Sequence, residues 1–248
     1  MKRFLLSLII PLLLSCSVQE GNEEFCPSLI AHAGGAVDSC LYTNSREALE
    51  LAFEEGYRFV ELDLLFTSDS VLVAAHSWSK FNEMTGFSHK GDTAPSYNDF
   101  ANRKICGCYT PLSAADINAF FEQNEDLYLV TDKVSDPAIL HHHFPGLKNR
   151  MVVEAFSFRH YSQLKDEGYF RVLYSCMAED LNSTLLNLDI ADVEWFALHT
   201  TGFDNFMFRI FNTFCNFDIA LFTVDDMNAI PQKYRSAVKM VYTNYIEP

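Results

Sequence analysis

The sequence is poor in basic residues: 18 Lys and Arg are set against 33 Asp and Glu, giving a formal charge of −15 over 248 residues. Nucleic acids and anionic membrane surfaces both select for positive charge, so we expect a soluble domain that binds neither. Hydrophobic residues make up 49% of the chain and aromatic residues 14%, which excludes a disordered polypeptide. No internal repeat is visible, and nothing indicates a second domain.

The N-terminus lacks an apolar run long enough to span a bilayer. Lys2 and Arg3 precede an apolar stretch at residues 4–14, and small residues follow it. This order is typical of a secretory signal peptide and too short for a membrane anchor. We predict a signal peptide at residues 1–15, a polar tether at 16–27 and one domain at 28–248. Loss of Lys2 and Arg3 would change the formal charge from −15 to −17.

Residues 13–16, Leu-Leu-Ser-Cys, resemble the processing site of bacterial lipoproteins. The resemblance implies that Cys16 becomes lipidated and attaches the exported protein to a bacterial membrane, in the periplasm or at the cell surface. An ordinary signal peptidase site is the alternative.

The sequence also lacks a second close pair of cysteines to match Cys106 and Cys108, which argues against a structural zinc site. Of the seven cysteines, six remain if Cys16 is lipidated. Export permits disulfides, but six cysteines allow too many pairings for one to be chosen. We therefore expect a structural disulfide or free buried thiols.

From residue 28 onward, apolar runs of strand length alternate with amphipathic stretches of helix length. Strands are predicted at 28–32, 59–66, 127–132, 151–156, 171–176, 195–199, 219–223 and 240–243, with a short strand extension at 71–77. Helices are predicted at 45–56, 113–123, 136–144, 159–167, 180–190, 204–214 and 229–237. Eight such units in a chain of this length predict a single (β/α)8 TIM barrel, of class α/β. Residues 78–110 show no clear period and predict a long loop after the second strand.

Two carboxylates interrupt the apolar strand at residues 59–66. Side chains alternate along a strand, so Glu61 and Asp63 point to the same face. Two like charges there are costly unless they are compensated, and a hard divalent cation is the usual compensation. The alternative is a strand end whose acids reach solvent or pair with Lys or Arg.

Other polar residues follow the remaining strands, where the active sites of barrels are built. They are His32, Asp132, Glu154, Ser157, His199, Thr223 and Thr243. We expect Thr223 and Thr243 to be hydrogen-bonded strand-end hydroxyls and His199 to be a wall residue.

The order and spacing of several motifs resemble the opening of the glycerophosphodiester phosphodiesterases, a family of the phospholipase-C-like barrels. The motifs are His-Ala-Gly-Gly at 32–35, Tyr-Thr-Asn-Ser at 42–45, Glu-Leu-Asp at 61–63, His76, and Leu-Val-Thr-Asp-Lys at 129–133. Several positions depart from the family pattern. Tyr42 and Thr43 stand where the family has Pro-Glu before the Asn, and Lys133 is adjacent to Asp132, not two residues on. Ala33 stands where the family has an Arg expected to hold the phosphate, and Ser77 stands where an Asp usually follows the second His.

The resemblance implies a phosphodiesterase that hydrolyses glycerophosphodiesters or related headgroup or glycan phosphodiesters. Glu61, Asp63 and Asp132 would hold one divalent cation, Mg²⁺ or Ca²⁺. His32 and His76 would share the proton transfers, because imidazole titrates near neutral pH. Lys133, Asn44 and Glu154 are candidates to bind the substrate or its phosphate. Lys133 has an equal alternative role, pairing with a carboxylate at the end of the barrel.

Two other functions remain open. One is a catalytically silent barrel lipoprotein that binds a phosphorylated or glycan ligand, which Ala33 and Ser77 favour. The other is a phospholipase that acts on an intact lipid. The oligomeric state cannot be predicted from the sequence.

Overall fold

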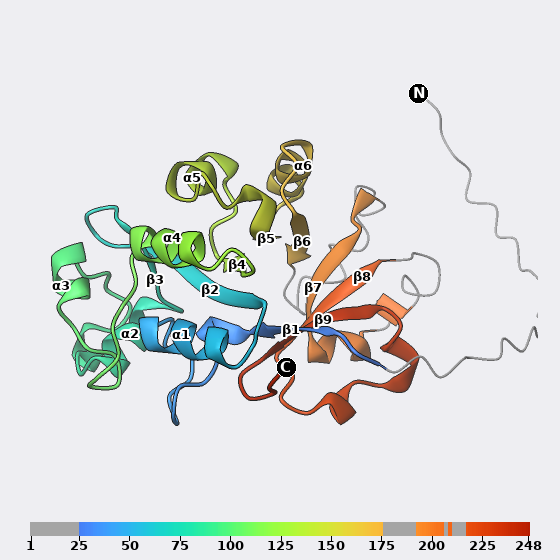
Figure 1. Cartoon of the computed structure of the whole chain (residues 1–248), viewed down its shortest axis with the longest axis horizontal. Coiled ribbons are helices and arrows are strands. Elements are labelled where there is room, and N and C mark those ends of the chain that lie inside the picture. The colour runs from blue at the N-terminus through green and yellow to red at the C-terminus, as the bar shows by residue number, and fades with distance from the viewer. Residues whose placement is uncertain (1–24, 176–191, 206–207, 210–216) are drawn as a thin grey trace, which may run out of the picture.

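The computed structural model describes residues 25–175, 192–205, 208–209 and 217–248. Eight parallel strands close into a barrel in the order β1-β9-β8-β7-β6-β5-β4-β2, and β2 pairs back with β1 (Figure 1). The strands are β1 (Ser28–Ala31), β2 (Phe59–Phe66), β4 (Tyr128–Asp132), β5 (Met151–Ala155), β6 (Arg171–Ser175), β7 (Trp195–His199), β8 (Asp218–Phe222) and β9 (Val238–Thr243). A ninth strand, β3 (Leu72–Ala74), pairs antiparallel with β2. The predicted TIM barrel and its strand extension are confirmed.

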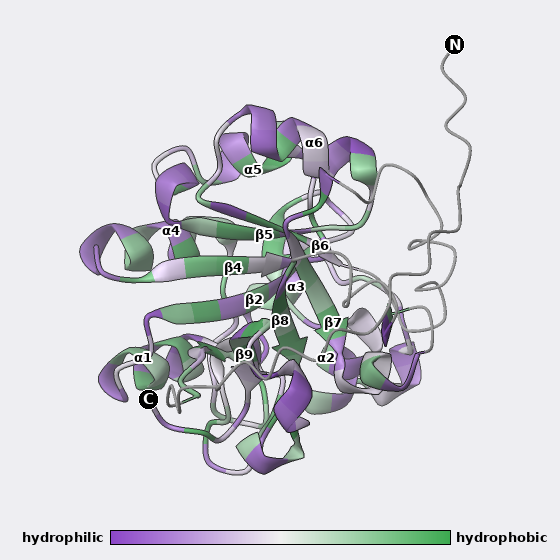
Figure 2. Ribbon diagram, turned by 90° about the vertical axis from the view of Figure 1, so that its right-hand side faces the viewer, coloured by the Kyte–Doolittle hydropathy of each residue, from purple (hydrophilic) through white to green (hydrophobic). Residues whose placement is uncertain are grey.

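Alternation along the strands divides the apolar side chains into two layers, and Figure 2 shows apolar residues concentrated along the strands. One layer fills the barrel interior. Its buried members are Ile30, Val130, Val152, Leu173, Ala197, Ala220, Met240 and Tyr242. The other layer lies between the barrel and its helices and includes Val60, Leu62 and Leu64 of β2. Glu61 and Asp63 therefore share the face opposite these three residues and point into the barrel.

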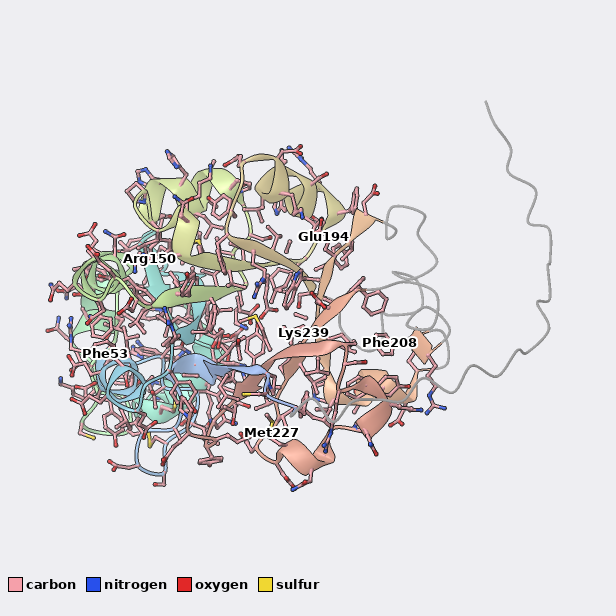
Figure 3. All side chains as sticks on the ribbon, turned by 45° about the vertical axis from the view of Figure 1, so that its right-hand side comes forward. Phe53, Arg150, Glu194, Phe208, Met227 and Lys239 are labelled. Carbon is pink, nitrogen blue, oxygen red and sulfur yellow. A yellow bond between two sulfur atoms is a disulfide. The ribbon has the colours of Figure 1, made fainter. Side chains whose placement is uncertain are left out.

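The helices are α1 (Arg46–Glu54), α2 (Trp78–Met84), α3 (Tyr97–Ala101), α4 (Ala114–Gln123), α5 (Pro137–His143) and α6 (Phe158–Asp166). Side chains cap the N-termini of α1 and α4, which lie within the helices predicted at 45–56 and 113–123. Ser45 accepts a hydrogen bond from the backbone N–H of Ala48, and Ser113 forms a capping box with Asp116. At the other end of α4, Arg150, labelled in Figure 3, donates to the carbonyls of Phe121, Asn124 and Leu127. These contacts fix the helices against the barrel.

The segment 78–110 is more ordered than its predicted loop. It contains α2 and α3, and both are capped by serines, Ser77 and Ser96. Their aromatic residues pack into a small separate core that includes Trp78, Phe81 and Phe100. The prediction was wrong because helices of seven and five residues are too short to show a helical period. Ser77, one of the departures from the family pattern, acts here as a helix cap, a role that Asp serves equally well.

The helix predicted at 229–237 is also wrong. Two short 3-10 helices take its place, η6 (Met227–Ala229) and η7 (Gln232–Tyr234). Pro231 lies between them, and proline has no N–H to continue a helical hydrogen-bond pattern. The helix predicted at 180–190 lies outside the described residues, and so does most of that predicted at 204–214. Asp204, at the start of the second of these ranges, is the last residue of the 3-10 helix η5 (Thr200–Asp204).

A disulfide joins Cys40, in the segment between β1 and α1, to Cys106 in the 78–110 segment. The Tyr109 hydroxyl donates to Asp38 between the same two segments. Of the two expectations for the cysteines, the structural disulfide is therefore the one seen, and Cys26 and Cys108 are free and exposed. Cys16, Cys176 and Cys215 lie outside the described residues. Within the described ranges, no helix combines the length and apolar character needed to cross a bilayer.

Candidate active site

A cavity of about 570 Å³ opens where the parallel strands end, and polar side chains from separate strands line it. Among its lining residues are His32, His76, Glu61, Asp63, Asp132, Lys133 and Glu154. These residues are spread over more than a hundred positions of sequence, and the closed barrel brings them together because its parallel strands end at one rim.

The three predicted metal-binding acids converge in this cavity. Asp63 of β2 lies directly opposite Asp132 of β4 in the strand register. Glu61 precedes Asp63 by two residues and so lies on the same face. One carboxylate oxygen from each of the three residues lies within 4.8 Å of the others. This is the arrangement of oxygen ligands that a hard divalent cation requires.

Hydrogen bonds hold the two β2 carboxylates in place. The backbone N–H of Ala33 donates to Oε2 of Glu61 at 2.7 Å. The side chain of Asn44 donates to Oδ2 of Asp63 at 2.9 Å, and its Oδ1 accepts from the Asp63 backbone N–H at 2.9 Å. Asn44 is fully buried. Asn44, a candidate for binding substrate, contacts Asp63 in this structure and is not among the cavity-lining residues.

The three acids carry more negative charge than the neighbouring Lys133 can offset. Burial, followed by Asp63 and Asp132, raises the pKa of Glu61 well above its ordinary value. Burial also raises the pKa of Asp132, although Lys133 opposes that effect. Burial would raise the pKa of Asp63 too, but the Lys133 ammonium, His76 and the Asn44 hydrogen bond together outweigh burial, and the pKa of Asp63 is lowered. One lysine is therefore not enough to neutralise three neighbouring carboxylates.

An orphaned oxygen supports the same conclusion. Oε1 of Glu61 is buried and has no hydrogen-bond partner among the described residues. A buried carboxylate oxygen without a partner is costly. A divalent cation beside Asp63 and Asp132 would satisfy it, so the donor set fits Mg²⁺ or Ca²⁺.

Lys133 follows β4 directly and turns back toward the acids. Its φ of 69° lies in the left-handed region. Nζ of Lys133 is 2.9 Å from Oδ1 of Asp63 and 2.9 Å from Oδ2 of Asp132. Burial would lower the pKa of Lys133, but the two carboxylates raise it, so the side chain is charged. Of its two predicted roles, pairing with carboxylates is the one seen in this structure.

The two candidate catalytic histidines lie on different elements. His32 follows β1, and its Nδ1 is 3.1 Å from the hydroxyl of Thr223 at the end of β8. Burial, partly offset by Asp63, lowers the pKa of His32 to about 4, so its imidazole is neutral at pH 7. His76 follows β3, where the Ala75 backbone N–H donates to the Asp63 carbonyl at 2.9 Å and holds the chain against β2.

Glu154 lies deeper in the barrel. The hydroxyl of Tyr242 donates to its Oε1 at 2.6 Å, and Ser175 makes a second side-chain hydrogen bond. Burial, reinforced by Asp132, raises the pKa of Glu154 to about 8. A protonated carboxylic acid therefore lies at neutral pH on the wall of a cavity that also contains ionised carboxylates.

Sequence reasoning missed several residues that line the cavity, among them Tyr42, Ser175 and Tyr242. Tyr42 lines the cavity, with its ring centroid 5.0 Å from that of His32 and 5.0 Å from that of His76. Ser175 lines it from the end of β6. The position of Ser175 at a strand end was a usable signal. Tyr42 lies in an irregular segment, and no local pattern indicates where its ring points. Thr223, expected to be a hydrogen-bonded strand-end hydroxyl, is one, and its partner is His32.

Comparisons with known proteins agree with this geometry. The sequence matches the model of the glycerophosphoryl diester phosphodiesterase family over residues 33–149. No curated protein sequence matches the chain significantly.

Solved structures share the fold at low identity. A glycerophosphodiester phosphodiesterase from Thermotoga maritima has a TM-score of 0.65 and 17% identity, covering 88% of this chain and 95% of that one. One from Parabacteroides distasonis has a TM-score of 0.62 and 16% identity, covering 88% and 92%. A phosphodiesterase from Oleispira antarctica, solved in complex with the product sn-glycerol-3-phosphate, has a TM-score of 0.63 and 18% identity, covering 89% and 94%. Residues 33–149 therefore match the glycerophosphoryl diester phosphodiesterase family, and the likeness of fold to these structures extends along most of the chain.

Proposed function

We propose that this protein is an exported, metal-dependent phosphodiesterase that hydrolyses glycerophosphodiesters or related headgroup or glycan phosphodiesters. The observation that carries the proposal is the convergence of three carboxylates and two histidines in one cavity. The Oleispira antarctica protein was solved with sn-glycerol-3-phosphate as its product, and we extend that class of ligand to this chain.

Glu61, Asp63 and Asp132 would hold the cation. When bound, it supplies positive charge that offsets the charge developing on the phosphodiester. The protein's own part is to keep these carboxylates in place: the Ala33 and Asn44 hydrogen bonds hold Glu61 and Asp63, and Lys133 pairs with Asp132. The Ala33 and Asn44 contacts come from the segment after β1, so the motifs of this segment support the two acids of β2.

His32 and His76 divide the proton transfers. His32 is neutral at pH 7, so it is suited to accept the proton of the attacking hydroxyl, from water or from a neighbouring alcohol of the substrate. Thr223 holds the His32 ring through Nδ1, and if Nδ1 donates to the Thr223 hydroxyl, Nε2 is the basic atom. His76 then delivers a proton to the departing alcohol. Each proton taken up at one side of the phosphorus is matched by one released at the other.

The test is a panel of phosphodiesters incubated with purified protein and Mg²⁺ or Ca²⁺. We expect release of an alcohol that stops with chelator and is lost in the His32→Ala and His76→Ala variants. If no diester is cleaved under any of these conditions, the catalytic proposal is wrong.

One observation favours a second function, a catalytically silent binding protein. Ala33 is fully buried where the family has an Arg, and Lys133 is engaged by Asp63 and Asp132. The cavity therefore has fewer basic groups for phosphate than the family pattern implies. Binding of sn-glycerol 3-phosphate without turnover of any diester would support this second function.

Export and lipidation of Cys16 are a separate part of the proposal. They rest on the apolar run at residues 4–14 and the Leu-Leu-Ser-Cys sequence that follows. In a bacterial host, the wild-type protein should be found in the membrane fraction and the Cys16→Ser variant in the soluble fraction. A wild-type protein that is already soluble after export would indicate plain secretion.

A further inference from the structure

Tyr42 is placed to contact whatever lies between the two histidines. It belongs to the segment between β1 and α1, and its ring contacts the imidazoles of both His32 and His76. It also lines the cavity that holds the three acids. Any substrate that reaches both histidines must therefore pass beside the phenol.

Position 33 provides no donor to the cavity. The Ala33 side chain is fully buried, and its backbone N–H is bonded to Glu61. The backbone N–H of Asn44 donates to the Ala33 carbonyl at 3.1 Å, so the segment that carries Tyr42 lies directly beside position 33. A side chain from this segment can reach the part of the cavity that Ala33 leaves without a donor.

The other hydroxyls that line the cavity have partners. Tyr242 donates to Glu154, Ser175 is bonded to the same carboxyl group, and Thr223 is bonded to His32. Thr223 also makes a side-chain hydrogen bond with Tyr42. If His32 donates from Nδ1 to Thr223, the Thr223 proton goes to the Tyr42 oxygen. The proton of Tyr42 is then available to an acceptor in the cavity.

The backbone holds Tyr42 in an unfavourable conformation. Its φ is 59°, in the left-handed region that bulky residues rarely adopt. Contacts on both sides impose this geometry: the Cys40–Cys106 disulfide and the Tyr109–Asp38 hydrogen bond precede it, and the bonds of Asn44 follow it. A strained residue held by its surroundings in a cavity is typical of a binding or catalytic position.

We propose that the Tyr42 hydroxyl donates a hydrogen bond to a non-bridging oxygen of the bound phosphate group, in place of the basic residue that position 33 lacks. Tyr42 is then a substrate-binding residue. The inference rests on the proposed function, because it assumes a phosphate group between the two histidines. Burial raises the pKa of Tyr42, so the phenol keeps the proton it has to donate.

The test is the Tyr42→Phe variant, which removes one hydroxyl and keeps the ring contacts with both histidines. Isothermal titration of Mg²⁺-loaded or Ca²⁺-loaded protein with sn-glycerol 3-phosphate should show binding weakened roughly 10- to 100-fold, the range for a hydrogen bond to a charged group. The affinity for the metal alone should not change. Tyr128→Phe is the matched control, because Tyr128 is a half-buried tyrosine at the start of β4, at the opposite end of the barrel. It should bind as the wild type does.

Equal affinity of wild type and Tyr42→Phe would overturn the inference, and so would a wild-type protein that binds no sn-glycerol 3-phosphate. Hydrolysis measured in parallel separates this inference from the proposed function. If wild type and Tyr42→Phe cleave a diester with the same KM and kcat, the inference fails and the proposed function stands. If the wild type cleaves no diester but binds sn-glycerol 3-phosphate, and Tyr42→Phe binds it more weakly, the proposed function fails and the role of Tyr42 stands.

Discussion

Lys133 and Asp63 form an ion pair inside the barrel: Nζ of Lys133 lies 2.9 Å from Oδ1 of Asp63, and the Asp63 side chain is only 2% exposed. The same ammonium contacts Asp132 at 2.9 Å. Both acids belong to the set that fits a divalent cation. Lys133 and a bound cation would therefore neutralise the same carboxylates, and their contributions to stability should depend on each other.

The Lys133→Met variant should show this dependence. Without a divalent cation, removal of the ammonium leaves Asp63 buried and unpaired, and the free energy of unfolding should fall by about 3 kcal/mol, the lower end for a broken buried pair. Added Mg²⁺ or Ca²⁺ should then raise the Tm of the variant more than that of the wild type. Denaturation with chelator and with each cation measures both effects.

Lys80→Met is the control, because the Lys80–Glu83 pair at 3.4 Å is exposed. Exposed pairs contribute about 0–1 kcal/mol, so this variant should behave as wild type with and without metal. If Lys133→Met is as stable as wild type in chelator, the ammonium does not stabilise the acids as we infer.

The cation itself should bind at Asp63. Calorimetry of wild-type protein should show one site for Mg²⁺ or Ca²⁺, and Asp63→Asn should bind at least about 10-fold more weakly because a charged ligand becomes neutral. Binding to the folded state should also raise the Tm of the wild type. Asp166→Asn, which changes an exposed acid at the end of α6, serves as the control. Undiminished binding by Asp63→Asn would contradict the assignment.

The strands and the acidic cluster could be predicted because both follow from local alternation. Val60, Leu62 and Leu64 face the helices, so Glu61 and Asp63 had to face the barrel interior. Once eight strands are counted, closure of the barrel brings Asp132 beside Asp63 without further information. The capping residues Ser45 and Ser113 likewise marked helix starts within the chain itself.

The surroundings of Tyr42 could not be predicted, because long-range contacts decide them. Cys40 and Cys106 are 66 residues apart, and their bond fixes the segment that presents Tyr42 to the cavity. The contact between Asn44 and Asp63 could not be predicted for a similar reason, because Asp63 lies on another element. The two helices of the 78–110 segment were missed because each is too short to show a period, although Ser77 and Ser96 marked their starts.

The two histidines should act as a unit. His32→Ala and His76→Ala should each lower kcat/KM at least about 100-fold on a cleaved diester, the low end for general acid–base catalysis. The double variant should be little worse than either single one, because both residues serve one transition state. His142→Ala, an exposed histidine of α5, should keep full activity. Losses that multiply in the double variant would show that the two residues act independently.

Glu154 makes a prediction about pH. Folding raises the pKa of its carboxyl group from 4.5 to about 8, because burial favours the neutral form. The unfolded chain loses this proton near pH 4.5, whereas the folded protein keeps it until about pH 8. Relative to a neutral isostere, the wild type is therefore most stable below pH 4.5 and loses stability as the pH rises from about 4.5 to about 8. The loss cannot exceed about 1.4 kcal/mol per pH unit.

Glu154→Gln provides that isostere, because its Oε1 can still accept from Tyr242 and its amide can still reach Ser175. In chelator, so that no bound cation changes the charge nearby, urea unfolding of both proteins at pH 5, 6, 7 and 8 gives the difference in free energy. The free energy of unfolding of Glu154→Gln, relative to that of the wild type, should increase with each rise in pH. Glu125→Gln, which removes an exposed carboxylate, provides the reference for that trend. A constant difference across this range would mean that the folded protein ionises Glu154 as readily as the unfolded chain does. In that case Glu154 would be ionised beside a charged partner in the cavity. Its negative charge would repel a phosphate, and its predicted role in binding the phosphate would have to be abandoned.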